Sequence, residues 1–226
     1  LDLFDGRKDL HNKLIKTCIE PKITFKDDPL RMLRAIRFAS QLSFDIESET
    51  FQGIIENKER IKILSYSRIS DELNKIIMTE KPSYGFKLLL TSGLLKIIFP
   101  EMDNLKGIEK INNHIHKDNF YHTLKVLDNV SKVSNNLWLR WAAILHDIAK
   151  PLTKRYNEKV GWTFHGHEDL GSRMVPKIFK KFNLPTNHHM RFVKKLVRLH
   201  LRPIALVKEN ITDSAIRRLL YEAGND

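Results

Sequence analysis

The sequence has little cysteine and no long apolar stretch. Cys18 is the only cysteine among 226 residues, so we expect no disulfide within the chain. The longest unbroken apolar run covers residues 141–145 and is far too short to span a bilayer. No signal-peptide pattern opens the chain. These absences predict a protein of the reducing cytoplasm that has no membrane as a partner.

The chain also has fewer acidic than basic residues, with 27 Asp and Glu against 39 Lys and Arg, which gives a formal net charge of +12. A content of 42% hydrophobic residues excludes intrinsic disorder and predicts one or two domains with a sizeable core. The positive charge favours a polyanionic partner, nucleic acid first and an acidic membrane surface second. Residues 170–226 hold twelve basic and four acidic residues, a local charge of +8. An ordinary solvated surface explains any single cluster equally well.

Apolar residues at helical spacing, separated by prolines, predict an all-α fold. Only the opening residues 1–6 alternate between apolar and acidic side chains, which predicts a short strand before the first turn. Nine of the ten histidines and all three tryptophans follow residue 113, so we place a domain boundary between residues 100 and 113. The predicted helices cover residues 29–40, 47–57, 68–79, 83–91, 119–134, 137–149, 167–182, 186–200 and 212–222.

A carboxylate and three arginines share one face of the first long predicted helix. Arg31, Arg34 and Arg37 recur every three residues, and Asp28 lies at the head of their stripe as the expected N-cap. An Asp acceptor beside an Arg donor fork can read a nucleobase edge, and further arginines can reach phosphates. An exposed face with an ion pair between neighbouring turns is the alternative.

Four segments of the first hundred residues resemble motifs of the bacterial-type tRNA nucleotidyltransferase and poly(A) polymerase family. Residues 27–39, DDPLRMLRAIRFA, are similar to the family's E-D-P-x-R-x-L-R-A-x-R-F-A neck motif. Residues 2–10 resemble its D-x-x-x-G-x-x-D-L element, and residues 68–76 its R-I-x-x-E-L-x-K helix. Gly93-Leu94-Leu95 followed by Phe99-Pro100-Glu101 resembles its G-L-L and P-E elements, and all four occur in the family's order.

This resemblance implies that Asp28 and Arg31 select CTP or ATP, while Arg34 and Arg37 support that site or contact phosphates. It also implies the 3′ acceptor end of tRNA as partner, and Mg²⁺ as the ion for nucleotidyl transfer. Asp27 departs from the family's Glu and could alter the geometry beside the template. The catalytic D-x-D carboxylates do not occur in their Gly-rich context. We therefore expect a fragment that does not polymerise alone.

A second group of residues has the composition of a metal site. Neutral imidazoles and a carboxylate suit a divalent ion, and His146-Asp147 can supply two adjacent ligands. The pair falls in the apolar helix predicted over residues 137–149, so we expect it to be buried. A buried Asp then needs a cation or a metal beside it. Each histidine taken alone is more commonly structural. The other candidates are His122, His167 and His200.

The surroundings of these residues resemble the HD metal-dependent phosphohydrolase domain. The matching segments are residues 120–124, 145–151 and 164–168. The resemblance implies metal binding by His122, His146 and Asp147, with His167 and His200 as secondary candidates and Lys150 as a phosphate contact. It implies Mg²⁺ or a divalent transition metal as cofactor, and 2′,3′-cyclic phosphodiesterase or phosphatase activity. Four histidines lie outside the pattern, and we expect them at the surface or in turns: His114, His116, His188 and His189.

The full prediction is a helical neck and body followed by an HD-type helical domain. Residues 1–12 would end the catalytic head with a strand remnant, residues 13–105 would form the RNA- and nucleotide-binding neck and body, and residues 106–226 an HD domain without its last ligand. Two alternatives stay open, a stand-alone HD nucleotide phosphohydrolase and a non-catalytic RNA-binding module. The sequence leaves open CCA, terminal-A or poly(A) addition, and the oligomeric state.

Overall fold

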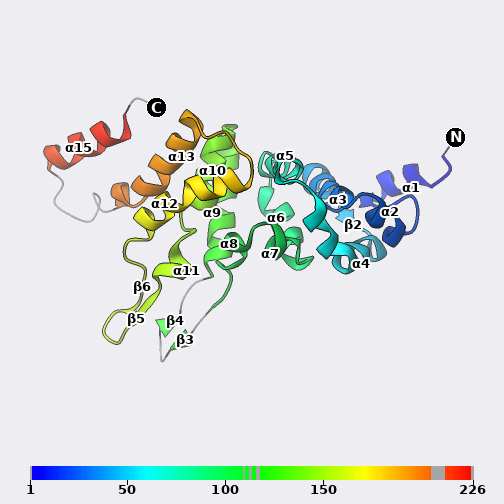
Figure 1. The fold of residues 1–226 in the computed structure, drawn as a ribbon, viewed down its shortest axis with the longest axis horizontal. Helices are drawn as coiled ribbons and strands as arrows, with labels where there is room; N and C mark the ends of the chain where they lie inside the picture. The colour runs from blue at the N-terminus through cyan, green and yellow to red at the C-terminus, as the bar shows by residue number, and fades with distance from the viewer. Residues whose placement is uncertain (1, 109, 112–113, 116–117, 205–211, 225–226) are drawn as a thin grey trace. The chain divides into compact units, whose positions relative to one another are not determined.

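The computed structural model describes residues 2–108, 110–111, 114–115, 118–204 and 212–224 (Figure 1). Helices dominate these residues, and the strands form three small two-stranded ribbons, which confirms the all-α prediction. The chain forms two compact units, residues 1–104 with 127–137, and residues 105–126 with 138–226. Within the described ranges, no helix combines the length and the apolar character needed to cross a membrane.

The first unit is built around helix α3, which packs against α5 and α6. Met32, Leu33 and Ile36 of α3 are buried at helical spacing. Helix α6 approaches closely at Gly85, where a β-carbon would lie 2.5 Å from Ile76 of α5. The elements are α1 (Gly6–His11), β1 (Leu14–Ile15), α2 (Pro21–Asp27), α3 (Leu30–Leu42), β2 (Asp45–Ile46), α4 (Ser48–Asn57), the 3-10 helix η1 (Lys58–Ile63), α5 (Tyr66–Ile77), α6 (Pro82–Thr91), α7 (Leu94–Ile98) and α8 (Pro100–Asp103).

The predicted strand at the start of the chain is wrong. Residues 2–5 form a turn that leads into helix α1. The carboxylate of Asp2 accepts hydrogen bonds from the backbone N–H groups of Gly6 and Arg7, both at 2.9 Å, and so satisfies two donors at the start of that helix. The alternating pattern therefore reflects a helix-start carboxylate and exposed apolar side chains, and the first strand is the two-residue β1, which pairs in parallel with β2.

The second unit has an aromatic core between three helices. Trp141 of α10 is fully buried, with ring centroids 6.3 Å from Phe179 and 5.8 Å from Phe182. Helices α12 and α13 pack against each other beside this core. The elements are β3 (Lys110–Ile111), β4 (His114–Ile115), α9 (Asn119–Val133), α10 (Leu137–Leu145), α11 (Lys150–Thr153), β5 (Arg155–Asn157), β6 (Gly161–Thr163), α12 (His167–Lys181), α13 (His188–Leu199) and α15 (Asp213–Ala223). Helix α9 ends among the residues grouped with the first unit.

One helix boundary decides the chemistry of the second unit. The helix predicted over residues 137–149 ends at Leu145, and residues 146–149 form turns before the short helix α11. His146 and Asp147 therefore lie at the end of a helix and not within one, which corrects the prediction. Asp147 is nevertheless buried, with 1% of its surface exposed, as its apolar neighbours predicted.

Candidate metal centre and nucleotide-facing helix

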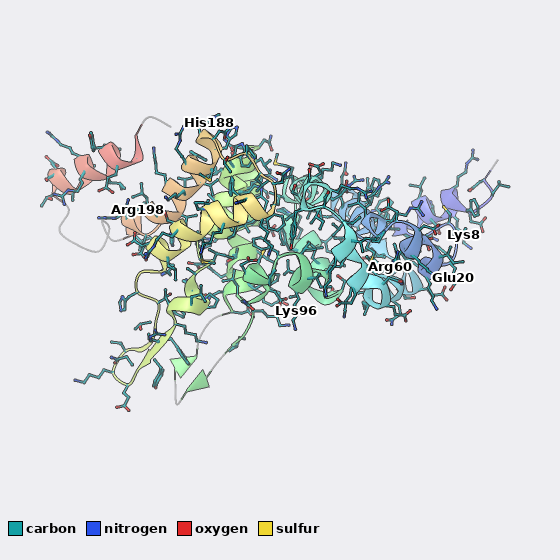
Figure 2. The ribbon with its side chains drawn as sticks, in the orientation of Figure 1. Lys8, Glu20, Arg60, Lys96, His188 and Arg198 are labelled. Carbon is teal, nitrogen blue, oxygen red and sulfur yellow. The ribbon has the colours of Figure 1, made fainter. Side chains whose placement is uncertain are left out.

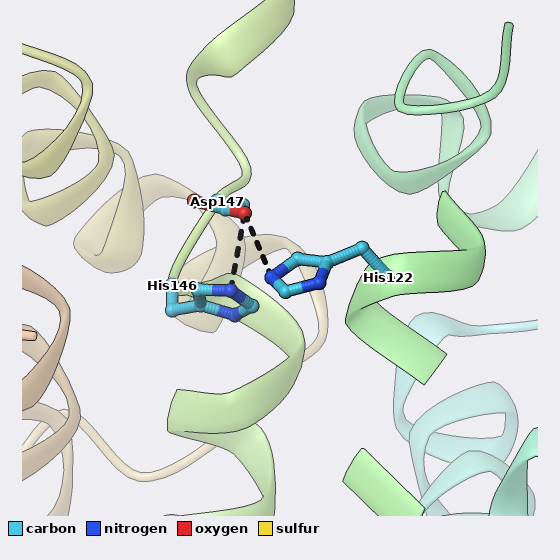
Figure 3. A group of neighbouring side chains, drawn as sticks. All are labelled: His122, His146 and Asp147. Atoms are coloured by element: carbon cyan, nitrogen blue, oxygen red, sulfur yellow. Dashed lines mark ion pairs between the residues drawn. The ribbon is translucent and has the colours of Figure 1, made fainter. Parts of the chain in front are cut away.

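Asp147 is the centre of a cluster of four histidines and a lysine. Its Oδ2 lies 3.1 Å from Nε2 of His146 and 3.7 Å from Nε2 of His122 (Figure 3). Its Oδ1 lies 3.2 Å from Nε2 of His167 and 3.7 Å from Nε2 of His200. The side chains come from α9, the turn after α10, the start of α12 and the end of α13. The structure thus brings together all five residues that the sequence singled out.

Three of these histidines are oriented by backbone carbonyls. The Nδ1 atom of His146 lies 2.8 Å from the carbonyl oxygen of Ala143. The Nδ1 atom of His167 lies 2.7 Å from the carbonyl oxygen of Phe164, and that of His200 lies 2.7 Å from the carbonyl oxygen of Val197. A carbonyl only accepts hydrogen bonds, so each Nδ1 carries a proton, and Nε2 is the ring nitrogen that faces Asp147 and could bind a metal. Metal-binding histidines are commonly held in this way.

The charge on Asp147 is strongly favoured. Burial would raise the pKa of its carboxyl group, but contacts with His146 and His167 and the ammonium group of Lys150 hold that pKa far below its ordinary range. Lys150 Nζ donates a hydrogen bond of 2.7 Å to Oδ2. Burial lowers the pKa of His167, yet its contacts with Asp147 and with the Phe164 carbonyl raise it overall. Burial lowers the pKa of His200.

These donors fit a divalent ion on geometric grounds. Unprotonated Nε2 atoms facing carboxylate oxygens repel one another unless a proton or a cation lies between them. The ligand atoms of His122, His146 and Asp147 all lie within 4.8 Å of one another, and so do those of Asp147, His167 and His200. Asp147 belongs to both groups and offers a different oxygen to each. Borderline metals prefer this combination of nitrogen and oxygen ligands.

Among the residues that the structure describes, no other histidine belongs to these two groups. His165 is exposed in the loop before α12. His188 is exposed at the start of α13, as predicted, whereas His189 is partly buried and stacks on Trp138 with ring centroids 4.6 Å apart. His114 lies in β4, and His116 falls outside the described residues.

The structure divides the arginine stripe of α3 into an exposed and a paired part. Arg31 and Arg34 are exposed, and Arg31 donates a hydrogen bond of 3.3 Å to the carbonyl of Thr24. Arg37 is directed at Glu72, with Nε 2.6 Å from Oε2. Helix α3 begins one residue later than predicted, and its N-cap is Pro29 instead of the predicted Asp28. The Asp28 carboxylate still accepts a hydrogen bond from the Leu30 N–H at 3.1 Å, so it satisfies one donor in the first turn.

Two residues of α5 hold this stripe and were not assigned a role from the sequence. Arg68 lies 3.4 Å from the Asp28 carboxylate, and Glu72 bridges Arg37 and Lys75, the latter at 2.8 Å. Burial would raise the pKa of Glu72, but its bonds to Lys75 and Arg37 lower it overall. Their spacing is the sequence feature that could have identified them, because residues 68 and 72 share one face of a helix that begins after the capping Ser65.

Two family models match the chain, one in each part. The model described as "Probable RNA and SrmB- binding site of polymerase A" matches residues 43–106, and the HD domain model matches residues 119–217. Together with the helical fold and the Asp147 cluster, they define a protein that joins an RNA-binding region of the polymerase A type to an HD domain.

Relatives narrow this class. An A-adding tRNA nucleotidyltransferase of Deinococcus radiodurans is 29% identical over 98% of this chain and 51% of its own length. A multifunctional CCA protein of Mannheimia succiniciproducens is 33% identical over 82% of this chain and 46% of its own. The curated relatives that this chain matches are therefore tRNA nucleotidyltransferases. The chain spans about half the length of these relatives.

Solved structures share the fold. A Thermotoga maritima CCA-adding enzyme complexed with tRNA superposes with a TM-score of 0.61 at 18% identity, over 97% of this chain and 47% of that one. A Bacillus stearothermophilus CCA-adding enzyme in complex with CTP gives 0.54 at 21% identity, over 99% of this chain and 47% of that one. At these identities the likeness concerns the fold alone.

Proposed function

We propose that the protein containing this chain transfers CMP or AMP to the 3′ end of tRNA, with Mg²⁺ as the ion for that step. In this proposal the chain supplies nucleotide selection and tRNA binding, and the catalytic carboxylates belong to the head that family members carry. The observation that supports it is the start of α3, where Asp28 and the exposed Arg31 stand at the template positions of the neck motif and Arg68 holds the Asp28 carboxylate.

In this arrangement Asp28 accepts, and Arg31 donates, hydrogen bonds at the edge of the incoming base. Arg34, exposed one turn further along α3, contacts phosphates. Arg37 acts through its bond to Glu72, which fixes α3 against α5, and this positioning role agrees with its partial burial. Neither CCA nor terminal-A addition is preferred, since relatives of both kinds match the chain.

The test measures nucleotide choice by the whole protein on a tRNA that lacks its 3′ CCA. We expect wild type to incorporate CTP or ATP and to reject UTP, and the Arg31→Ala variant to lose this discrimination by about tenfold or more while it binds tRNA normally. Lys87→Ala is the matched control, because Lys87 is an exposed cation on α6. Equal incorporation of all three nucleotides by wild type, or unchanged discrimination in Arg31→Ala, refutes the template role.

We also propose that the HD unit is a metal-dependent phosphohydrolase acting on phosphoesters at the tRNA 3′ end, as a 2′,3′-cyclic phosphodiesterase or phosphatase. The Asp147 cluster supports this second activity. His122, His146 and Asp147 would hold Mg²⁺ or a divalent transition metal, and Asp147, His167 and His200 are suited to a second ion. When bound, such an ion activates a water molecule for attack on a phosphoester. Lys150 would contact the phosphate, since its ammonium group already lies at the centre.

The test is hydrolysis of 2′,3′-cyclic AMP by the metal-loaded chain. We expect turnover by wild type, loss of at least a hundredfold in His146→Ala, and unchanged turnover in His11→Ala, which removes an exposed histidine of α1. Metal content per chain is measured in parallel. If wild type binds metal but shows no turnover, the ion has a structural role. If wild type shows neither bound metal nor turnover, the cluster is a hydrogen-bonded part of the core.

A further inference from the structure

Helix α13 carries a basic face outside the Asp147 cluster. Arg191, Lys194 and Arg198 are exposed and recur at positions i, i+3 and i+7, so they line one side of the helix over about 10 Å. Figure 2 labels Arg198 toward one end of α13 and His188 toward the other. These three side chains line a cavity of about 410 Å³. The other lining residues are Ser172, Lys195, Leu199 and Glu222.

The charges of this cavity leave two cations uncompensated. Arg198 lies 3.4 Å from Asp169, and Lys195 donates a hydrogen bond of 2.8 Å to the carbonyl of Ala223. Among the described residues of the lining, Glu222 is the one acidic side chain. Arg191 and Lys194 have no ion pair with any residue that the structure describes. The cavity therefore keeps a net positive charge, which suits a phosphate.

A stack of rings reaches the surface at the start of the same helix. Trp138 lies between Phe179, at a centroid distance of 5.9 Å, and His189, at 4.6 Å and an interplanar angle of 19°. His188 follows at 3.9 Å from His189 and is exposed. The stack thus ends in an exposed ring three residues before Arg191, on the same side of α13.

We propose that this α13 face, made of His188, Arg191, Lys194 and Arg198, binds single-stranded or end-frayed RNA. The cations would contact backbone phosphates, and the His188 ring would stack on an unpaired base. Proteins that bind single-stranded nucleic acid commonly combine aromatic rings with a row of cations, because bases stack on the rings while phosphates pair with the cations. An anionic membrane would bind the cations but would offer no base to stack on the rings. The inference deepens the proposed function, on which it rests for the identity of the RNA as tRNA.

The test compares binding of a tRNA transcript to the full chain in two matched double variants. Arg191→Ala with Lys194→Ala removes two cations of the α13 face. Arg155→Ala with Lys159→Ala removes one arginine and one lysine from the exposed hairpin β5–β6. We expect the first variant to weaken binding about tenfold and to lower the slope of log K against log salt by roughly 1.5 to 2 units, because two phosphate contacts are lost. The second variant should bind like wild type.

The stacking role has its own readout. His188→Ala should weaken binding by about fivefold without changing the salt slope, because base stacking releases no counterion. Equal loss in both double variants, or a flat salt dependence in wild type, overturns the phosphate contacts. Binding of wild type to anionic vesicles but not to RNA, with loss of vesicle binding in the Arg191→Ala, Lys194→Ala variant, would assign the face to a membrane and overturn the proposal. If the first variant binds RNA as wild type does and still selects nucleotides normally, the proposed role of the α13 face is wrong. The proposed function is then unaffected.

Discussion

At the scale of single residues, Asp147 decides what the second unit can do. Its side chain is 2% exposed and is surrounded by Lys150 and four imidazoles. A buried carboxylate is destabilising unless a cation compensates it, and Lys150 supplies one positive charge from a distance of 2.7 Å. Backbone carbonyls satisfy the Nδ1 atoms of three histidines and thereby direct the ligand nitrogens at one carboxylate.

Added divalent metal should therefore stabilise the folded chain. An ion that binds only the folded state at a free concentration 100 times its dissociation constant adds about 2.7 kcal/mol. That corresponds to a rise in Tm of about 5 to 10 °C for a chain of this size. Thermal unfolding with Mn²⁺, Mg²⁺ and a chelator measures the effect. We expect the rise to vanish in Asp147→Asn and to persist in Asp71→Asn, which changes an exposed carboxylate on α5. A rise of the same size in both variants would place the ion elsewhere.

At the scale of elements, the ion pair between α3 and α5 fixes the helix that carries the arginine stripe. The side chains of Arg37 and Glu72 are 12% and 6% exposed, so little water screens the pair. Glu72 also bonds Lys75 on its own helix, which makes one buried carboxylate the partner of two cations. Removing the carboxylate leaves the partly buried Arg37 without its charged partner. Loss of one member of a buried ion pair destabilises a protein more than replacement of the whole pair by apolar residues.

Glu72→Gln should lower the free energy of unfolding by about 3 kcal/mol at pH 7. The pKa of Glu72 is lower in the folded state than its ordinary value of 4.5. Its contribution to stability is therefore present above pH 4.5 and is lost as the pH falls through the folded-state pKa. Urea titrations of wild type and variant from pH 7 to pH 3 should show their difference shrinking only below about pH 4.5. Glu56→Gln, an exposed control on α4, should match wild type throughout, and a pH-independent difference for Glu72→Gln would contradict the ion-pair explanation.

At the scale of the whole molecule, helical periodicity predicted most of the architecture, because long amphipathic segments bury one face whatever their partners are. Helices α4, α6, α9, α12 and α13 lie within two residues of the predicted ranges. The short helices α2, α7, α8 and α11 were not predicted, since four to seven residues carry too little periodicity. The turn at Asp2 and the end of α10 depend on local hydrogen bonds that periodicity does not encode.

The candidate sites were predictable to a different degree. The histidines and Asp147 were singled out correctly as neighbours, because their flanking sequences resemble the HD pattern, although their role as ligands stays a prediction. Their tautomers depend on carbonyls three residues away, which only the structure supplies. The stripe on α3 was predicted as one surface, yet Arg37 is turned against Glu72, because the burial of a partner on α5 is a tertiary effect.

The two proposed activities act on the same RNA end, and one measurement addresses both. The whole protein is given a tRNA that lacks its 3′ CCA and ends in a 2′,3′-cyclic phosphate, together with CTP, ATP and divalent metal. We predict that wild type hydrolyses the P–O3′ bond of the cyclic phosphate, which leaves the phosphate on O2′, and then extends the freed 3′-hydroxyl. His146→Ala should fail on this tRNA yet extend one with a free 3′-hydroxyl, whereas Arg31→Ala should open the ring and then misincorporate. Extension of neither tRNA by wild type, or identical behaviour of His146→Ala and wild type on both, would contradict the account.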